Sequence, residues 1–258
     1  MPPTRLRKKQ GIVILLDALG ASEYSEEKIK KFLSARTEIN SGIADLARSG
    51  PAGGLLSTPS IYTFGDTIVI TIQFKGKKKY GSQIVCAALL MRRYLFHSLE
   101  QGILVRGSFA IGSYIEDSES NTVMGEAITD AAQWYEKADW MGVASTPRTN
   151  SALEFYVTPE SLSRPKFLHK YSVPLKGGSA LDLYSIAWPG VFHDETILKH
   201  RKKANPRTWF LEIFKDFSFP ASATSKYENT KRYFDYVASQ IANSSLQGTL
   251  RDETAHRP

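Results

Sequence analysis

The sequence predicts an α+β fold, with helices flanking a mixed sheet of the ferredoxin-like or palm type. The chain has 258 residues, of which 42% are hydrophobic and 23% charged, the balance of a globular protein and not of a disordered one. Strand-like apolar runs alternate with stretches of helical spacing in the order β-α-β-β-α-β-α. Two of the strands form a hairpin, so part of the sheet is expected to be antiparallel, whereas right-handed crossovers supply its parallel part.

A buried strand and a long helix come first. Residues 11–17, GIVILLD, form a continuous apolar run that is typical of a strand covered on both faces. Residues 22–48 follow with apolar side chains at helical spacing, and Ser25 with Lys28 supplies only half of a capping box. The glycine-rich stretch 50–54 is predicted to be a loop.

A hairpin and a second helix come next. Residues 60–64 and 67–74 are rich in Ile, Val, Thr, Tyr and Phe, and the pair Gly65-Asp66 between them predicts a two-residue turn. Residues 80–100 carry apolar side chains around most of their circumference, which predicts a long helix largely covered by other elements.

The remaining elements complete the sheet and add a helical tail. We expect a strand over 103–115, an acidic loop over 116–121, a helix over 124–140, and further strands over 153–158, 171–174 and 181–188. The composition then becomes charged and helical, most clearly in 226–242. The predicted organisation is a basic extension over 1–10, a domain over 11–189 and a helical appendage over 190–258.

Charge and cysteine content limit the compartment and the partners. The net charge of +7 gathers in residues 5–9, 75–79 and 199–203, which fits either solvated loops or contact with polyanions. Cys86 is the single cysteine, so no disulfide can form within the chain, and a reducing compartment is expected. The apolar run 12–16 is far shorter than the ~20 residues of a membrane span or the ~7–15 of a signal sequence. A cytoplasmic location and no membrane partner are therefore predicted.

Two aspartates are candidates for chemistry. Asp17 directly follows the first buried strand, although a turn or helix-cap role also fits it, and Asp66 lies in the hairpin turn, where aspartate is common for backbone reasons. If the first strand adjoins the hairpin, the two carboxylates converge, and their oxygens suit Mg²⁺ or Mn²⁺ beneath substrate phosphates. A helix starting after Gly20, through Ala21 and Ser22, would offer backbone N–H groups to those phosphates. Two such ions describe phosphoryl transfer.

Five segments carry a resemblance to a known family. They are VILLDALGAS (13–22), YTFGDTIVI (62–70), RGSFAIG (106–112), VMGEAITDAAQWYE (123–136) and YSVPLKGGSALDLY (171–184). In order and spacing they resemble class III nucleotide cyclases, and the match is closest to the bacterial pyrimidine cyclases of Pycsar antiphage defence, to which KYENTKRYFDYV (226–237) is also similar.

The resemblance implies an activity, a cofactor and an assembly. The domain over 11–189 would convert a nucleoside triphosphate, here UTP or CTP, to the 3′,5′-cyclic monophosphate and pyrophosphate. Two Mg²⁺ or Mn²⁺ ions per active site would bind at Asp17, Ala18 and Asp66. The family forms homodimers that share sites across the interface, and the cyclic product would act on a separate effector protein.

The resemblance also assigns the substrate contacts. Tyr62 stands at the base-reading position, where an aromatic ring favours a pyrimidine, although cross-strand packing also explains it. Thr122 is the second base-reading position, and its hydroxyl does not decide between uracil and cytosine. Thr129 replaces the family's transition-state Asn and Gln133 replaces its Arg. Some other cation must then offset charge on the phosphates, and the candidates are Lys176, which matches the family's phosphate-binding lysine, and Arg106, which pairing with an acid would also explain.

Three other interpretations compete with an active cyclase. An RNA-binding module would share the element order, but Ser108 stands where a stacking aromatic belongs, so no direct nucleic-acid partner is expected. Diguanylate cyclases and polymerase palms carry an acidic doublet where this chain has Thr67 and Ile68. A catalytically silent cyclase-like dimer would explain the missing Asn and Arg, but not the presence of both metal aspartates.

Overall fold

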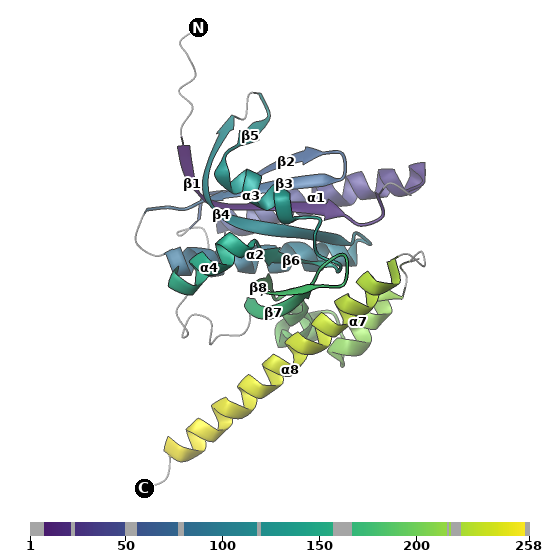
Figure 1. Ribbon diagram of the computed structural model, residues 1–258. Helices are drawn as coiled ribbons and strands as arrows, with labels where there is room; N and C mark the ends of the chain where they lie inside the picture. Colours follow the sequence, from purple (N-terminus) through teal and green to yellow (C-terminus); the bar gives the residue numbers. More distant parts are fainter. Residues whose placement is uncertain are drawn as a thin grey trace.

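A mixed sheet of eight strands forms the centre of the molecule (Figure 1). The computed structural model describes residues 8–21, 24–49, 56–76, 80–117, 120–156, 167–215, 217 and 223–255. The strand order is β2-β3-β1-β4-β6-β8-β7, with β5 paired to β4. The β4–β6 pair is parallel and the other pairs are antiparallel. The predicted α+β class is therefore confirmed.

The strands and helices have the following bounds. The strands are β1 Lys8–Ala18, β2 Ser60–Phe64, β3 Thr67–Gln73, β4 Val105–Asp117, β5 Thr122–Met124, β6 Gly142–Ser145, β7 Leu168–Pro174 and β8 Ala180–Ile186. The helices are α1 Glu26–Ser49, α2 Tyr80–Glu100, α3 Glu126–Trp134, α4 Pro147–Tyr156, the 3₁₀ helix η2 Trp188–His193, α6 Glu195–His200, α7 Pro206–Phe214 and α8 Thr224–Ala255.

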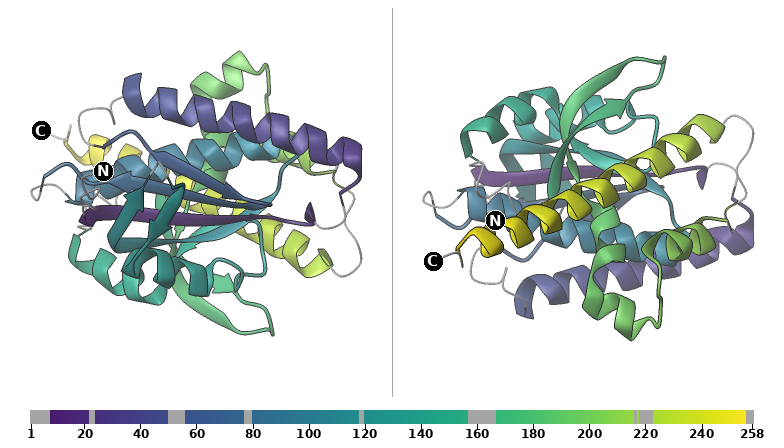
Figure 2. Two further views of the ribbon diagram at one scale, coloured as in Figure 1. Left: turned by 90° about the horizontal axis from the view of Figure 1, so that it is seen from above. Right: turned by 90° about the horizontal axis from the view of Figure 1, so that it is seen from below.

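The sheet separates two apolar clusters, because alternate side chains of β1 point to opposite faces. Ile12, Ile14 and Leu16 belong to the larger cluster with α1 and α2, whereas Val13 and Leu15 belong to a smaller cluster with α3. The left view of Figure 2 shows α1 and α3 on opposite sides of the sheet. A strand buried on both faces is what the unbroken apolar run predicts.

Three of the predicted elements are wrong in kind or extent. The strand expected over 153–158 is the end of helix α4 as far as Tyr156, and residues 157 and 158 lie outside the described residues. Pro147 occupies the first helical position, and the Thr146 hydroxyl accepts a hydrogen bond from the Thr149 N–H at 3.1 Å, which is a helix start that outweighs the strand-like composition.

The helix expected over 124–140 is also too long. It is confined to α3, because Gly125 has φ 129° and the chain leaves the helix after Trp134 to pair Ala138 with Leu175. The short strands β5 and β6 on either side were not predicted, since three or four residues are too few to reveal a period. The strand expected over 181–188 ends at Ile186, and Trp188 begins η2.

The C-terminal residues pack against the sheet domain. Trp188, Trp209, Phe210, Tyr233 and Phe234 are buried in the larger cluster. The Tyr233 hydroxyl donates to the Ile186 carbonyl at 3.0 Å, and α8 lies across the molecule in the right view of Figure 2. The domain boundary at residue 189 stays a prediction, but the residues beyond it share one hydrophobic core with β8. No helix among the described residues combines the length and the apolar composition that crossing a membrane requires.

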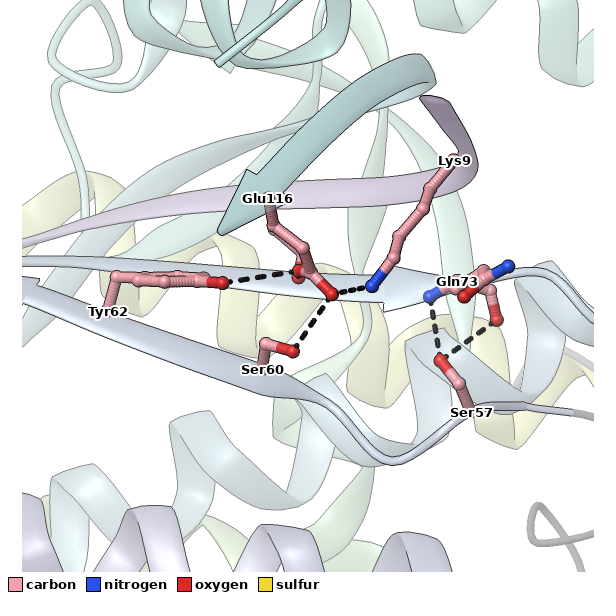
Figure 3. Close-up of polar contacts among 7 residues, drawn as sticks. Lys9, Ser57, Ser60, Tyr62, Gln73 and Glu116 are labelled. Atoms are coloured by element: carbon pink, nitrogen blue, oxygen red, sulfur yellow. Dashed lines mark hydrogen bonds and ion pairs between the residues drawn. The ribbon is translucent and has the colours of Figure 1, made fainter. Parts of the chain in front are cut away.

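Glycines allow β1 to lie close to both of its neighbouring strands. Gly11 faces Gly112 across the β1–β4 pair, and a Cβ at Gly11 would lie 2.1 Å from the carbonyl oxygen of Ile72 on β3. A Cβ at Gly107 would lie 2.1 Å from the carbonyl oxygen of Leu15. Close backbone approach of this kind is a common reason for glycine within a strand. The end of β4 lies against β2 and β3, where Glu116 accepts hydrogen bonds from Ser60 and Thr71 (Figure 3).

Candidate functional site

Asp17 and Asp66 lie at the same edge of the sheet. Asp17, the penultimate residue of β1, faces Thr67 across the β1–β3 pair, and Asp66 directly precedes Thr67 in the turn. The Ala18 N–H donates to the Asp66 carbonyl at 3.3 Å, which joins the end of β1 to the hairpin turn. The first strand therefore adjoins the hairpin, which was the condition for the two carboxylates to converge. We call this region the aspartate edge.

Arg106 reaches the aspartate edge from the opposite strand. It faces Asp17 across the β1–β4 pair, and its Nε and Nη2 donate to Asp17 Oδ2 at 3.0 and 2.8 Å. The residue is 8% exposed, and its buried Nη1 has no hydrogen-bond partner among the described residues. A buried guanidinium with an unused donor is costly unless a further acceptor arrives.

The carboxylate of Asp17 is not fully compensated by Arg106. Burial raises the pKa of Asp17, the hydrogen bonds and charge of Arg106 lower it, and the charges of Asp66 and Glu136 raise it further, so that the net direction is upward. Tyr24 lies near both aspartates, since burial and then their negative charges raise the pKa of its phenol. Crowding of negative charge in this way favours binding of a cation.

Lys176 lies in the turn between β7 and β8, within electrostatic range of the aspartate edge. Burial lowers the pKa of its ammonium, Arg106 and Lys226 lower it further, and Glu136 and Asp17 oppose them. The turn is formed by Gly177 and Gly178, whose φ angles of 90° and 86° favour glycine. Arg106 and Lys176 of one chain therefore lie close enough for their charges to interact, from strands far apart in the sequence.

Sequence reasoning missed Tyr135, Glu136 and Lys226 at this edge. Burial raises the pKa of Tyr135 to about 12, with a hydrogen bond to Glu136 and the charges of Glu136 and Asp17 contributing. Glu136 closes the segment 123–136 that carries the family resemblance, and Lys226 opens the segment 226–237. The charged residues at the ends of those two segments were the available signal.

The long helix expected over 22–48 begins later than predicted. Helix α1 begins at Glu26, with Ser25 as the cap that accepts from the Lys28 N–H at 3.3 Å. Gly20, with φ 75°, lies in a turn after Asp17, and Ala21 begins a 3₁₀ turn in which the Tyr24 N–H donates to the Ala21 carbonyl at 3.2 Å; Ser22 lies outside the described residues. Ser25, the half capping box, lies five residues after Gly20. The positive end of the α1 dipole therefore does not lie directly after Asp17.

Tyr62 belongs to a separate group of polar side chains, which we call the Glu116 cluster (Figure 3). It comprises Lys9, Ser60, Tyr62, Thr71 and Glu116. The Tyr62 hydroxyl and the Thr71 hydroxyl donate to Glu116 Oε2 at 3.3 and 2.8 Å, the Ser60 hydroxyl donates to Oε1 at 3.4 Å, and Lys9 forms an ion pair with Oε1. Burial raises the pKa of Glu116, but these hydrogen bonds and the charge of Lys9 outweigh burial and hold the pKa below its usual value.

The aspartate edge and the Glu116 cluster lie apart on the same face of the sheet. Tyr62 is 5% exposed and packs in the smaller apolar cluster, and its hydroxyl points toward Glu116. The Tyr62 backbone pairs with Val69, two residues along β3 from Thr67, the partner of Asp17. Its hydroxyl bonds Glu116, as does the hydroxyl of Thr71, which is four residues, or about 13 Å of strand, from Thr67. The structure thus brings together Asp17, Asp66, Arg106 and Lys176 but not Tyr62.

Thr122 and Thr129 form side-chain hydrogen bonds within their own hairpin and helix turn. The Thr122 hydroxyl donates to the Ser120 carbonyl at 3.1 Å, in the β4–β5 hairpin. The Thr129 hydroxyl donates to the Gly125 carbonyl at 3.2 Å, in the first turn of α3. Thr129 and Gln133 are exposed on this helix.

Oxygen donors at the aspartate edge suit a hard divalent cation. The described residues contain no group of three or more His, Cys, Asp or Glu side chains that would enclose a metal ion. Mg²⁺ requires less, because it takes one or two carboxylates and leaves its other positions to water and substrate phosphates. Asp17 and Asp66 offer carboxylates, and Ala18 offers its main-chain carbonyl. The donor set therefore fits Mg²⁺ or Mn²⁺ bound together with a phosphorylated substrate.

Comparison with known protein families and with curated proteins finds no match. Solved structures do resemble the chain. One is the catalytic core of a rhodopsin-guanylyl cyclase with converted specificity, in complex with ATPαS, with 12% identity, a TM-score of 0.45, and coverage of 71% of this chain and 98% of that one. Another is an adenylate/guanylate cyclase/hydrolase from Silicibacter pomeroyi, with 14% identity, a TM-score of 0.44, and coverage of 70% and 98%. At these values, the functional conclusion depends on the residues of the site.

Proposed function

We propose that this protein is a nucleotide cyclase that converts UTP or CTP to the 3′,5′-cyclic monophosphate and pyrophosphate. The observation that carries the proposal is the meeting of Asp17 and Asp66 at one edge of the sheet, beside the buried Arg106, whose Nη1 has no partner within the described part of the chain. The ordered segments that resemble class III cyclases, and the proximity of Lys176, support it.

The acidic residues prepare the edge for cations and the basic residues prepare it for phosphates. Asp17, Ala18 and Asp66 would hold Mg²⁺ or Mn²⁺, two per site, which when bound acidify the 3′-hydroxyl and neutralise charge on the leaving pyrophosphate. Arg106 keeps Asp17 ionised and oriented, and its Nη1 is available for a phosphate oxygen. Gly20, Ala21 and Ser22 would contact the phosphates through the chain that follows Asp17.

Arg106 and Lys176 are proposed to replace the cation missing at Gln133. During cyclisation the 3′ oxygen bonds to the α-phosphorus, the bond from that phosphorus to the bridging oxygen of the pyrophosphate breaks, and the hydroxyl proton passes to solvent. Negative charge grows on the phosphate oxygens, and fixed cations stabilise it. Lys176 lies in a glycine turn that leaves its side chain exposed to an incoming substrate.

The base would be read away from the aspartate edge of the same chain. Tyr62 and Thr122 are the proposed base contacts, and Thr129 is a further proposed substrate contact. The Tyr62 hydroxyl bonds Glu116, and the hydroxyls of Thr122 and Thr129 bond nearby main-chain carbonyls, so that none of the three bonds Asp17 among the described residues. A homodimer that places Tyr62, Thr122 and Thr129 of one chain against the aspartate edge of a second copy would complete each site. The cyclic product would then act as a messenger, in the cytoplasm, for a separate effector in antiphage defence.

Turnover of the four ribonucleoside triphosphates tests the proposal. Purified protein is incubated with ATP, GTP, CTP and UTP in Mn²⁺, and the products are separated by chromatography. We expect a cyclic product from UTP or CTP and none with Asp66→Ala. Product from ATP alone would overturn the role of Tyr62, and no turnover of any nucleotide would leave the catalytically silent dimer, which the engagement of Asp17 by Arg106 also fits.

A further inference from the structure

The first turns of α8 are attached to the aspartate edge through an intermediate segment, residues 137–141. The Thr230 hydroxyl accepts from the Met141 N–H at 2.9 Å, and Asn229 Nδ2 donates to the Asp139 carbonyl at 2.9 Å. Earlier residues of α8 therefore lie beside earlier residues of the segment, in the direction from Met141 toward Lys137.

The same segment holds the turn that carries Lys176. The Asp139 N–H donates to the Pro174 carbonyl at 2.8 Å, and the Lys176 N–H donates to the Lys137 carbonyl at 2.8 Å. Residues 137–141 therefore have α8 bonded at one end and the β7–β8 turn bonded at the other. Glu136, which affects the pKa values of both Asp17 and Lys176, immediately precedes this segment.

Lys226 occupies the position on α8 that faces this turn. It is one helical turn before Thr230, so both residues lie on the same face of the helix. Thr230 is 1% exposed against Met141, and its hydroxyl also donates to the Lys226 carbonyl at 2.6 Å. Lys226 therefore lies about 6 Å along the helix axis from Thr230, in the direction of Lys137 and Lys176. The positive charge of Lys226 accordingly contributes to lowering the pKa of Lys176.

Few acidic side chains are paired with these cations. Among the described residues, neither Lys176 nor Lys226 forms an ion pair, and Arg106 has a buried Nη1 without a partner. Arg106 on β4 and Lys226 on α8 thus each lie within electrostatic range of Lys176 in the β7–β8 turn, and Arg106–Asp17 is the single ion pair that the described residues form between these three cations and the acids. Cations held near each other in this way favour binding of a polyanion with several oxygens.

We propose that Lys226 is a phosphate-binding residue, which joins Arg106 and Lys176 in holding the polyphosphate part of a nucleoside triphosphate. The inference rests on the proposed function and deepens it, because it brings the residues after 189 into the substrate site. Helix α8 then has a direct role in binding as well as in packing, and Lys226 supplies part of the positive charge that Gln133 does not.

Binding of inorganic tripolyphosphate to the full chain tests this role without requiring turnover. Isothermal titration calorimetry in Mg²⁺ would compare the unmodified chain with Lys226→Gln, with Lys226→Arg, and with Lys199→Gln as the matched control, since Lys199 carries the same charge on α6. We expect Lys226→Gln to weaken binding about tenfold, Lys226→Arg to retain most of it, and Lys199→Gln to change it by less than about twofold. Lys226→Met, which keeps the aliphatic stem, replaces Lys226→Gln if that variant melts early.

The outcomes separate this inference from the proposed function. Wild-type affinity in Lys226→Gln, equal losses in Lys226→Gln and Lys199→Gln, or no binding by the unmodified chain would each overturn the role of Lys226, whether or not UTP is cyclised. Binding that depends on Lys226, together with no cyclic product from any nucleotide, would retain the phosphate site and reject the cyclase. If UTP is cyclised, the KM of Lys226→Gln should rise more than its kcat falls.

Discussion

Two carboxylates on one face of the sheet meet opposite electrostatic conditions. Asp17 and Glu116 are both largely buried and both pair with a cation from a neighbouring strand, Arg106 and Lys9 respectively. Yet burial raises the pKa of Asp17 on balance, whereas hydrogen bonds outweigh burial and lower that of Glu116.

The difference follows from the number of donors that each carboxylate receives. Glu116 accepts from Lys9 and from three hydroxyls, so its charge is satisfied by the protein. Among the described residues, Arg106 supplies all the side-chain donors to Asp17, and two further acids, Asp66 and Glu136, lie near it. A satisfied carboxylate holds strands together, whereas an unsatisfied one is prepared for a ligand. The aspartate edge is therefore the candidate site, and the Glu116 cluster is first a structural joint.

The largest effect is expected from removing a carboxylate at the aspartate edge. Asp66→Asn should reduce cyclase turnover by roughly 10³-fold, since a metal ligand is lost. Its melting temperature should stay the same or rise, because repulsion of Asp17 is relieved. Product assays and thermal melts of the same preparation measure both. Full activity in this variant would contradict the assignment of the aspartate edge, and not the Glu116 cluster, as the candidate site.

Removing the cation from each pair should affect stability unequally. Arg106→Ala leaves Asp17 buried without a side-chain donor and should lower the free energy of unfolding by about 3 kcal/mol. Lys9→Ala should cost only about 1 kcal/mol, because the Lys9 side chain is 28% exposed and three hydroxyls still donate to Glu116. Urea denaturation of both variants is the measurement, and equal losses would contradict the comparison.

The pH dependence of stability should have opposite signs at the two carboxylates. Glu116 has a lowered pKa, so its contribution is present above pH 4.5 and is lost as the pH falls through its folded value. The chain should therefore lose stability relative to Glu116→Gln on acidification. Asp17 has a raised pKa, so the chain should lose stability relative to Asp17→Asn as the pH rises above 3.8. Denaturation at pH 3 to 7 measures both differences, and parallel slopes would refute the contrast.

The smallest change is expected from Tyr62→Phe. One hydrogen bond of 3.3 Å is lost while Thr71 and Lys9 still hold Glu116, so the free energy of unfolding should fall by about 0.5–1 kcal/mol. If Tyr62 also reads the base, the ratio of kcat/KM for UTP to that for ATP should fall by roughly tenfold. An unchanged ratio would reduce Tyr62 to a packing residue.

Local patterns in the sequence were sufficient for the main elements of the sheet. The apolar run before Asp17, the two-residue turn at Gly65-Asp66 and the helix over 80–100 have strong periods or turn signals, and each is present. Helix α4 and strand β6 were missed because a cap at Thr146 and a four-residue strand are weak signals.

The site was predictable only where it follows from strand neighbours. Pairing of the first strand with the hairpin brings Asp17 to Asp66, and the pairing of Arg106 with an acid was one of its two interpretations. Glu136 and Lys226 reach the edge through packing of segments about 90 residues apart, as in the bond between Asn229 and Asp139. No pattern within a single segment contains that information.

The contact between the Ala18 N–H and the Asp66 carbonyl has a consequence for how the two carboxylates are spaced. Their backbones are joined by the sheet itself, so little conformational entropy remains to be lost when both side chains engage the same ligand. Mutations in the loops or helices can accumulate without moving one carboxylate relative to the other.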